Sequence, residues 1–425
     1  MNNWKEYKLE NIIKVKHGYA FKGAFFSKEP TNDILLSPGN FHIGGGFKTD
    51  KFKYYNGTYP ESYILKEGDI IVTMTDLSKE GDTLGYSAKI PPHNGIKYLH
   101  NQRLGLLELI NNDFNIDFLY WLLRTRDYQQ FIVSSATGTT VKHTSPTRIC
   151  EYVFKAPDFD TQTAIAEILS SLDDKIELNN KINQELENLA QTLFKQWFID
   201  FEFPNQNGDP YKSSGGEMVD SELGEIPKGW EVINIQDLGK IICGKTPSKK
   251  ISEYYGSDMP FIKIPDMHKN TYIVNSIDNL SVKGYNSQTN KTLPKNSIVV
   301  SSIATVGLVS LTSMPSQTNQ QINSIIPKVD WLTFYIYDLC KSLNDNFIQL
   351  ASGGSATLNM NTSTFKNISI LQPTEAVLKS YHFLVVSLFE QIEMNTKENQ
   401  ELTNLRDTLL PKLISGELEV NNHTF

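Results

Sequence analysis

This chain of 425 residues contains few cysteines and no long apolar run. Because no stretch of 18 apolar residues occurs, the sequence predicts no membrane-spanning helix, and the segment Met1–Glu6 lacks the apolar core of a signal peptide. The three cysteines, Cys150, Cys243 and Cys340, lie far apart without metal-site spacing. We therefore expect a cytoplasmic protein with buried, reduced thiols and no metal site.

Convincing catalytic motifs are missing as well. Residues 239–246 satisfy the spacing of a phosphate-binding loop, but Pro247 and the polar residues after it lack the helical period that must follow such a loop. Asp158 and Asp173 imitate part of a metal-nuclease signature. Along one helix these two carboxylates would lie on the order of 20 Å apart, which is too far to share an ion. We expect a non-catalytic chain that binds no cofactor itself.

The net charge of −8 disfavours a nucleic-acid binder if the chain is taken as a whole. The charge is unevenly distributed, however. Residues 1–157 carry 19 Lys and Arg against 16 Asp and Glu, and residues 226–371 carry 13 against 9, while the rest of the chain is acidic. Phosphate contacts need local Lys and Arg rather than a basic average. Two basic segments therefore permit DNA binding.

A repeat covers the chain. Residues 183–189 read Asn-Gln-Glu-Leu-Glu-Asn-Leu and residues 399–405 read Asn-Gln-Glu-Leu-Thr-Asn-Leu, an offset of 216 residues. Fainter echoes precede each copy, such as Asn101-Gln102 and Asn319-Gln320. Self-similarity at a fixed spacing indicates two copies of one structural unit. Each copy consists of a divergent globular block followed by a well-matched long helix. This suggests that the two blocks recognise different ligands.

The two helices carry matching heptad seams. Apolar residues and one asparagine recur every seven residues, and the core positions that we expect are Leu172, Asn179, Leu186, Leu193, Leu388, Asn395, Leu402 and Leu409. Ile182, Leu189, Leu384 and Leu405 are expected to lie beside them on the seam. Such a pattern predicts a coiled coil, in which a lone asparagine fixes register. With antiparallel helices, Asn179 and Asn395 can pair near the centre. The alternative is that each helix packs only on its own block.

These patterns predict an α+β fold with two mixed α/β domains, separated by two long antiparallel helices that form a coiled-coil spacer with an internal pseudo-two-fold repeat. About 38 helical residues give a rod of roughly 55 Å. The predicted boundaries are 1–157 for the first domain, 158–201 for the first helix, 202–229 for a linker, 230–372 for the second domain, 373–416 for the second helix and 417–425 for a tail.

Several strings carry a family resemblance. They are Phe201–Pro204, Pro210–Gly216 and Ser221–Trp230 in the linker, and Ile168–Ile176 and Leu410–Leu418 in the helices. With the duplicated layout, they make the whole chain resemble a specificity subunit of a type I DNA restriction-modification system. The resemblance implies two target-recognition domains that each read half of a bipartite double-stranded DNA site. It also implies two methyltransferase subunits, which dock mainly on the helical region and bring S-adenosylmethionine, and room for two helicase and nuclease subunits that perform restriction.

No family motif identifies the base-reading residues, so we select them by chemistry. Lys and Arg suit guanine and phosphate, and Asn and Gln suit adenine. The loop residues selected are Lys79, Asn101, Arg103, Lys142, His143, Lys249, Lys250, Lys263, Asn319 and Gln320. A structural role for Asn101 and Asn319 stays open, because both copies keep them. The alternative function is a coiled-coil scaffold with two protein-binding modules and no DNA role.

Overall fold

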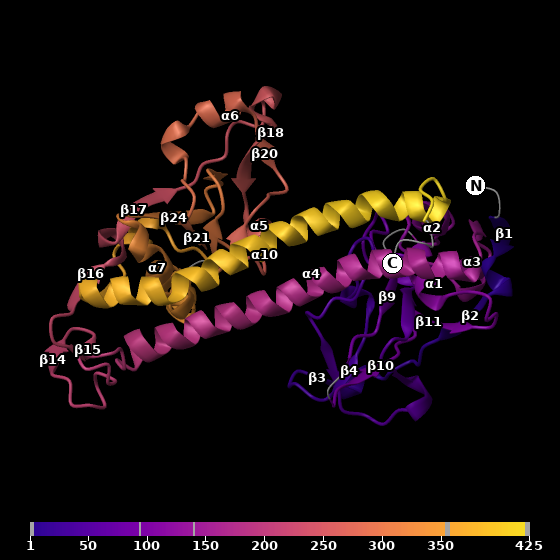
Figure 1. Cartoon of the computed structure of the whole chain (residues 1–425), viewed down its shortest axis with the longest axis horizontal. Helices are drawn as coiled ribbons and strands as arrows, with labels where there is room; N and C mark the ends of the chain where they lie inside the picture. The colour runs from indigo at the N-terminus through magenta and orange to yellow at the C-terminus, as the bar shows by residue number, and fades with distance from the viewer. Residues whose placement is uncertain (1–3, 93–94, 139–140, 353–357, 421–425) are drawn as a thin grey trace. The chain divides into compact units, whose positions relative to one another are not determined.

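The computed structural model describes residues 4–92, 95–138, 141–352 and 358–420 (Figure 1). The chain divides into two compact units. Unit 1 comprises residues 1–174 together with 402–425, and unit 2 comprises residues 175–401. Two long helices, α4 (Phe159–Phe194) and α10 (Glu375–Ser415), contribute to both units, and α4 continues as a π-helical turn over Lys195–Ile199. Among the described residues, no helix is both long and apolar enough to span a bilayer.

Unit 1 contains a block of short strands and helices. Its strands are β1 (Lys5–Lys8), β2 (Ile13–His17), β3 (Phe26–Ser27), β4 (Asp33–Leu35), β5 (Lys53–Tyr55), β6 (Ile64–Leu65), β7 (Ile70–Thr73), β8 (Thr75–Asp76), β9 (Ser87–Lys89), β10 (Lys97–Leu99), β11 (Leu104–Leu109), β12 (Lys142–His143) and β13 (Val153–Ala156). Its helices are α1 (Ile116–Leu122), α2 (Arg126–Ser134) and α3 (Pro146–Cys150). The strands form sheets in the orders β2-β11-β7-β9 and β3-β5-β4-β10-β6, and the two-stranded pairs β1-β13 and β8-β12.

Unit 2 contains a second block with related topology. Its strands are β14 (Met218–Ser221), β15 (Gly224–Pro227), β16 (Glu231–Asn234), β17 (Gly239–Cys243), β18 (Tyr255–Ile262), β19 (Tyr272–Ile273), β20 (Asn279–Leu280), β21 (Ile298–Ser301), β22 (Val309–Thr312), β23 (Gln317–Thr318), β24 (Ile322–Pro327) and β25 (Ser369–Gln372). Its helices are α5 (Ile264–Met267), α6 (Val282–Asn286), α7 (Thr333–Ser342), α8 (Asn344–Ala351) and α9 (Thr362–Lys366). The main sheet has the order β17-β24-β21-β22-β19.

The two blocks share one architecture. The strand order β2-β11-β7-β9 of unit 1 matches β17-β24-β21-β22 of unit 2, and the pair β1-β13 matches β16-β25. Helices α1, α2 and α3 occupy the same places in chain order as α7, α8 and α9. The internal repeat predicted from the sequence is therefore confirmed at the level of topology.

Local sequence explains where the short helices begin. Asn115 accepts hydrogen bonds from the first turn of α1, and Thr125 and Ser145 do the same for α2 and α3. In unit 2, Asn361 caps α9 in the same way. Side-chain oxygens at these positions satisfy backbone N–H groups that have no partner within the helix. Polar capping residues thus set where these short helices begin.

Each unit buries one main apolar core beneath the long helices. In unit 1, Trp121 and Phe118 of α1 pack with the first turns of α4 and the last turns of α10. In unit 2, the core includes Trp197 and Phe198, which lie in the π-helical turn and contact the ring of Tyr381. The offset of 216 residues places Leu413 and Ile414 of α10 at these positions, and both are buried in the core of unit 1.

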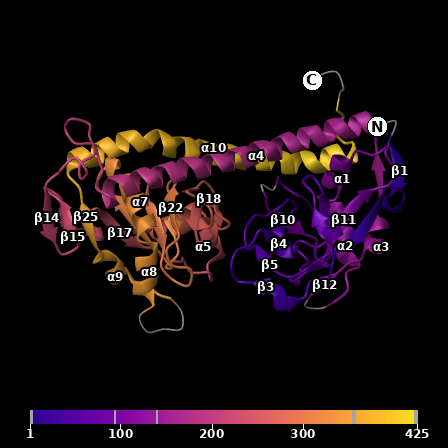
Figure 2. The ribbon, with the colours of Figure 1, turned by 90° about the horizontal axis from the view of Figure 1, so that it is seen from below.

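The long helices run antiparallel in both units, as predicted. In unit 1, Asp173 of α4 contacts Arg406 of α10. In unit 2, Asn179 contacts Asn399, and residues further along α4 contact earlier residues of α10. Figure 2 shows the two helices side by side along one side of each block.

The expected pairing of Asn179 with Asn395 is wrong. Asn179 donates instead to Asn399, with an Nδ2–Oδ1 distance of 2.9 Å, and Asn395 donates to Asn183 over 2.8 Å. Both seam asparagines are buried, as a core position requires. Each therefore meets a partner one helical turn away from the expected one, because the axial offset of the helices is set by packing that the heptad pattern does not report.

The expected apolar seam is also only partly buried. The seam leucines, namely Leu172, Leu186, Leu193, Leu388, Leu402 and Leu409, are half-buried. Ile182, Leu189, Leu384 and Leu405, expected beside the seam, face solvent. The buried positions include Ala190 and Ile392 instead. Each helix thus packs both on its partner helix and on a globular block, so the buried stripe is rotated from a pure two-helix seam.

Candidate nucleic-acid interface and the contacts that hold it

Four chain segments meet at the edge of the β2-β11-β7-β9 sheet where β2 and β7 end and β11 begins. Gly18 follows β2 and has no room for a side chain, because a Cβ atom would lie 2.1 Å from the carbonyl oxygen of Asn101. Asn101 Oδ1 accepts a 2.9 Å hydrogen bond from the N–H group of Arg103. The carbonyl of Arg103 accepts from Met74, and that of Met74 accepts from Thr144. We call this the unit 1 edge. It presents the exposed Arg103 side chain.

The ribbon of β8 and β12 extends the unit 1 edge. Lys142 lies opposite Asp76, and His143 lies on the next rung of the same pair. Asp76 accepts hydrogen bonds from Thr83 and from the backbone of the loop between them, which carries Lys79. Although burial raises it, these hydrogen bonds bring the pKa of Asp76 below its usual value. All the residues selected in the first block, including Asn101 and Arg103, therefore lie on or beside one edge.

The same arrangement recurs in unit 2. Gly244 follows β17, and a Cβ atom there would lie 2.1 Å from the carbonyl oxygen of Asn319. Asn319 Oδ1 accepts a 3.1 Å hydrogen bond from the N–H group of Gln321. The carbonyl of Gln321 accepts from Ser302, and that of Ser302 accepts from Met360, each over 2.8 Å. We call this the unit 2 edge. The chain after Gly244 turns into no helix, so the segment lacks the geometry of a phosphate-binding loop.

The residues selected in the second block occupy different surroundings. Gln320 is exposed on the unit 2 edge and accepts a hydrogen bond from Thr246. Lys249 and Lys250 are exposed in the segment that follows. Lys263 forms an ion pair with Asp278, so its charge is already compensated within the chain. Asn319 is buried and bonded to Gln321 through both ends of its amide.

Two residues of the unit 2 edge escaped selection. Gln321 occupies the position of Arg103, two residues after the framing asparagine. Asn359 is exposed and bridges to Ile303, where unit 1 pairs His143 with β8. The repeat offset contained this signal, because residues 359 and 143 are 216 apart.

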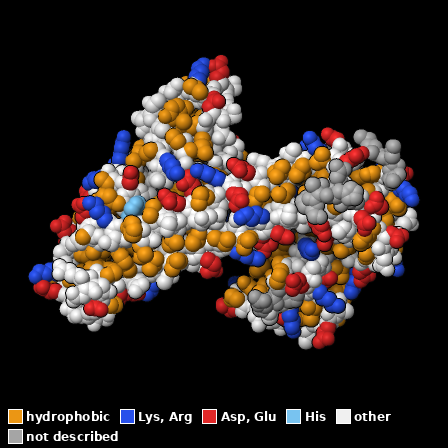
Figure 3. Space-filling view, in the orientation of Figure 1, with side chains coloured by type: hydrophobic (Ala, Val, Ile, Leu, Met, Phe, Trp, Pro, Cys, Tyr) orange, Lys and Arg blue, Asp and Glu red, His pale blue; other side chains and the backbone are white. Residues whose placement is uncertain are grey.

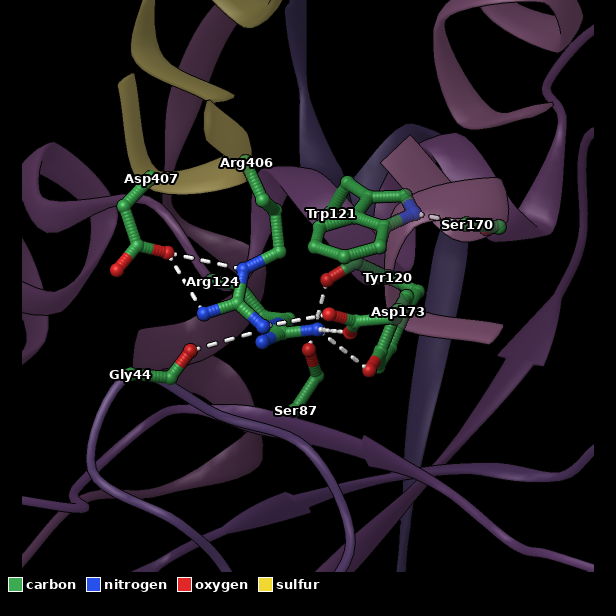
Figure 4. A network of polar contacts seen from close by, with 9 residues as sticks. All are labelled: Gly44, Ser87, Tyr120, Trp121, Arg124, Ser170, Asp173, Arg406 and Asp407. Atoms are coloured by element: carbon green, nitrogen blue, oxygen red, sulfur yellow. Dashed lines mark hydrogen bonds and ion pairs between the residues drawn. The ribbon is translucent and has the colours of Figure 1, made fainter. Parts of the chain in front are cut away.

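A charged cluster joins the first block to both long helices within unit 1 (Figure 4). Arg124, just after α1, places Nη1 2.6 Å from Asp173 Oδ2, and Arg406 binds the other oxygen of the same carboxylate. Arg124 also donates to the carbonyl of Gly44 and lies over the ring of Trp121, 4.3 Å from its centroid. The side chain of Arg124 is only 5% exposed. Arg406 also pairs with Asp407 over 2.7 Å, so Asp173 bridges two guanidinium groups, one of which has a second carboxylate partner.

Unit 2 has a counterpart built from different residues. Lys341, at the end of α7, lies 3.0 Å from Glu187 of α4. Glu187 also accepts hydrogen bonds from Tyr337 and Thr271. Burial raises the pKa of Glu187. The positive charge of Lys341 and these hydrogen bonds lower that pKa by more, so the net shift is downward. In each unit, therefore, an ion pair fixes the short helix of the block to a long helix.

A buried acid lies next to this second ion pair. Asp338 of α7 is fully buried, and its Oδ2 atom lies 2.7 Å from the Tyr381 hydroxyl of α10. The same hydroxyl lies 3.2 Å from the carbonyl oxygen of Ala190. Burial raises the pKa of Asp338 to about 8. At neutral pH the carboxylic acid can donate to Tyr381 through Oδ2 while Tyr381 donates to Ala190, and Oδ1 of Asp338 is left without a partner among the described residues.

We predict that Asp338→Asn removes a pH dependence of stability. The folded carboxyl, with a pKa of about 8, holds a proton that the unfolded carboxyl releases above about pH 4. Wild-type stability should therefore fall as pH rises from about 4 to about 8, by up to about 1.4 kcal/mol per pH unit. Denaturant unfolding between pH 5.5 and 8 should show the variant gaining on the wild type as pH rises. A constant difference across that range would contradict the assignment.

Apolar side chains remain exposed on the long helices, and some recur at the repeat offset. Leu178 and Met394 are 51% and 57% exposed, and Leu189 and Leu405 are each 47% exposed. On α4, Leu178, Ile182 and Leu189 share one face, since they are spaced by four and seven residues. Figure 3 shows hydrophobic side chains in line along the helices of unit 2. The described part of the chain holds no cluster of three or more His, Cys, Asp or Glu arranged for a metal ion.

Comparison with known proteins agrees with this arrangement. The family model of the type I restriction modification DNA specificity domain matches residues 1–188 and 227–404. The HindI specificity subunit of Haemophilus influenzae is 36% identical, covering 98% of this chain and all of that protein. The MjaIX specificity subunit of Methanocaldococcus jannaschii is 30% identical over 72% of this chain and 69% of its own length.

A solved structure shares the fold. The crystal structure of the type I restriction-modification S subunit from M. genitalium superposes with a TM-score of 0.57 over 97% of this chain and 96% of that chain, at 16% identity. Because the family model matches both repeats and a relative aligns end to end, the chain belongs to the family of type I restriction-modification specificity subunits. It is a non-catalytic subunit that confers DNA sequence specificity.

Proposed function

We propose that the two globular blocks read the two halves of a bipartite double-stranded DNA site. The observation that carries this proposal is the duplicated edge, in which one backbone frame displays different side chains in the two units. Two half-sites of different sequence require different polar groups, held in equivalent positions by the same backbone frame. The basic excess of each block, in residues 1–157 and 226–371, suits phosphate contacts beside the bases.

The two long helices would set the spacing between the half-sites. An antiparallel pair is stiff, and its register is limited by the buried contacts of Asn179 with Asn399 and of Asn183 with Asn395. In other DNA-binding proteins, rigid geometry of this kind fixes half-site separation.

The exposed apolar residues of the helices would dock two adenine-methyltransferase subunits. Internal two-fold repetition lets one chain bind two identical partners through equivalent surfaces. Leu178 with Met394, and Leu189 with Leu405, supply such equivalent positions. The partners would bring S-adenosylmethionine and the methyl-transfer chemistry, and two restriction subunits could join the same assembly.

Genome-wide mapping of methylated adenines tests the proposal. Deletion of the gene for this chain should abolish methylation at one bipartite motif, and expression of the chain with its methyltransferase subunits should restore it. A genome in which no motif depends on this chain would exclude the DNA-reading role and would favour a scaffold with two protein-binding modules.

We predict that each of the substitutions Leu189→Glu and Leu405→Glu prevents one of the two methyltransferase subunits from binding. A buried apolar anchor contributes about 2 kcal/mol or more, so a charge there should weaken docking roughly 30-fold or more. Leu189→Glu alone and Leu405→Glu alone should each leave one methyltransferase subunit bound, and the double variant should leave none. Size-exclusion chromatography with light scattering gives the stoichiometry.

The matched control is Ile277→Glu, which places the same charge at an apolar residue exposed outside the long helices, in unit 2. It should keep both partners. Full assembly of the Leu189 and Leu405 double variant would remove the helices as the docking surface.

A further inference from the structure

The two edges divide their residues into a shared frame and a displayed position. In each unit an asparagine accepts the N–H group two residues later, at 2.9 Å in unit 1 and 3.1 Å in unit 2. The backbone carbonyl of that later residue then accepts from the neighbouring strand, at 2.9 and 2.8 Å. The side chains of Asn101 and Asn319 therefore hold the turn through these hydrogen bonds. The residues that follow in the turn and stay accessible are Arg103, which is exposed, and Gln321, which is half-buried.

The displayed groups are free for a ligand. Within the described residues, the Arg103 guanidinium has no hydrogen bond or ion pair, although Arg124, Arg148 and Arg406 all have carboxylate partners. The Gln321 amide accepts from Asn319 Nδ2 over 3.0 Å, which orients its plane. Its NH₂ group donates to no atom of the described residues. An exposed, uncompensated guanidinium and an oriented amide are both base-reading groups.

The chemistry available to the two blocks differs sharply. Residues 1–157 contain four arginines, whereas residues 204–371 contain none. Arginine pairs bidentately with the O6 and N7 atoms of guanine, and glutamine pairs with the N6 and N7 atoms of adenine. The second block cannot use the arginine–guanine pair anywhere. Its exposed amides, including Gln320 and Asn359, favour adenine contacts instead.

Both edges also lie away from the helix pair of their own unit. In Figure 2, β12 of unit 1 lies on the side of its block remote from α4 and α10, and α8 and α9 of unit 2 lie on the remote side of theirs. A duplex could approach these sides without competing for the exposed apolar residues of the helices.

Resting on the proposed function, we propose that Arg103 and Gln321 are equivalent specificity-determining residues in the two half-sites. Arg103 reads a guanine in the half-site of the first block. Gln321 reads an adenine in the half-site of the second block. Asn101 and Asn319 are positioning residues that hold the two readers and contact no base.

The test uses the full chain expressed with its methyltransferase subunits, followed by mapping of methylated adenines across the host genome. Arg103→Ala should relax the guanine preference at one position of one half-site by roughly 10- to 100-fold, as expected for a lost bidentate base contact. Gln321→Ala should relax an adenine position in the other half-site only. Arg126→Ala is the matched control, because Arg126 is exposed at the start of α2, outside the edge, and this variant should leave the motif unchanged.

The outcomes separate the two proposals. If Arg103→Ala lowers methylation equally at all sites, Arg103 contacts phosphate and the inference fails. It also fails if the motif is unchanged, or if both half-sites relax together. In each of these cases the wild-type bipartite motif still supports the proposed function. Only the absence of any chain-dependent motif in the wild type would overturn the proposed function itself.

Discussion

Asp173→Ala is expected to lower the free energy of unfolding by about 3 kcal/mol, the lower end of the loss typical of removing one partner from a buried ion pair, because the Asp173 side chain is 27% exposed. Asp173 is the carboxylate partner of both Arg124 and Arg406. Its removal leaves Arg124 without a carboxylate partner close to Arg406, which keeps Asp407, and the Arg124 side chain is 5% exposed and cannot recover its hydration. Repulsion between the two cations adds to the desolvation cost. Chemical denaturation of the purified chain measures the loss.

The control for this prediction lies on the same helix. Glu177 and Lys181 form an i, i+4 pair with both side chains more than half exposed. Glu177→Ala should cost only about 0.3–0.5 kcal/mol. If the two alanine variants unfold alike, the charged cluster of unit 1 contributes no more than a surface pair, and the argument from burial is wrong.

The cluster also has a consequence for the first block. Arg124 links the loop at Gly44, helix α1 and helix α4 within unit 1. Its counterpart, Lys341 with Glu187, makes the corresponding link in unit 2. Both clusters join a recognition block to the long helices, so each fixes the direction in which its edge is presented. The two clusters use different residues, arginines with Asp173 in unit 1 and Lys341 with Glu187 in unit 2.

The helices and the repeat were predictable because their signals are local and periodic. A seven-residue pattern is visible in any window, and an offset of 216 residues is visible by comparison. The partner of Asn179 was not predictable in the same way. Heptads define which face of a helix is buried, but they leave the axial offset open by a turn. That offset depends on contacts such as Tyr381 with Ala190, which join residues 191 apart in sequence.

The candidate interface was predictable only in outline. Composition pointed to polar loops in both blocks, and five of those picks lie along the unit 1 edge. It could not separate Asn319, which is buried and holds the turn, from Gln321, which the turn displays. That distinction depends on which side chain bonds to the backbone, and amino-acid type alone does not encode it. The charged cluster was invisible for a similar reason, because Gly44, Arg124, Asp173 and Arg406 are scattered along the chain.

Asn179→Leu is expected to cost about 1–3 kcal/mol, since it leaves the half-buried side-chain carbonyl of Asn399 without the Asn179 donor. The double variant with Asn399→Leu should recover most of this loss, because both polar partners are then replaced together. Pairing Asn179→Leu with Asn395→Leu should instead give nearly additive losses, because Asn395 bonds to Asn183. A double-mutant cycle by denaturant unfolding distinguishes the two pairings. Strong coupling between residues 179 and 395 would contradict the structure.

Although its stability recovers, the double variant Asn179→Leu, Asn399→Leu should lose specificity for a single spacer length. An apolar seam without its asparagine contacts accepts slipped registers that the polar pairs exclude. If the helix pair sets the half-site spacing, the Asn179→Leu, Asn399→Leu chain should methylate sites with more than one spacer length while its half-site sequences stay the same. A single unchanged spacer would mean that the globular blocks alone determine the helix register, and that the buried asparagines serve stability only.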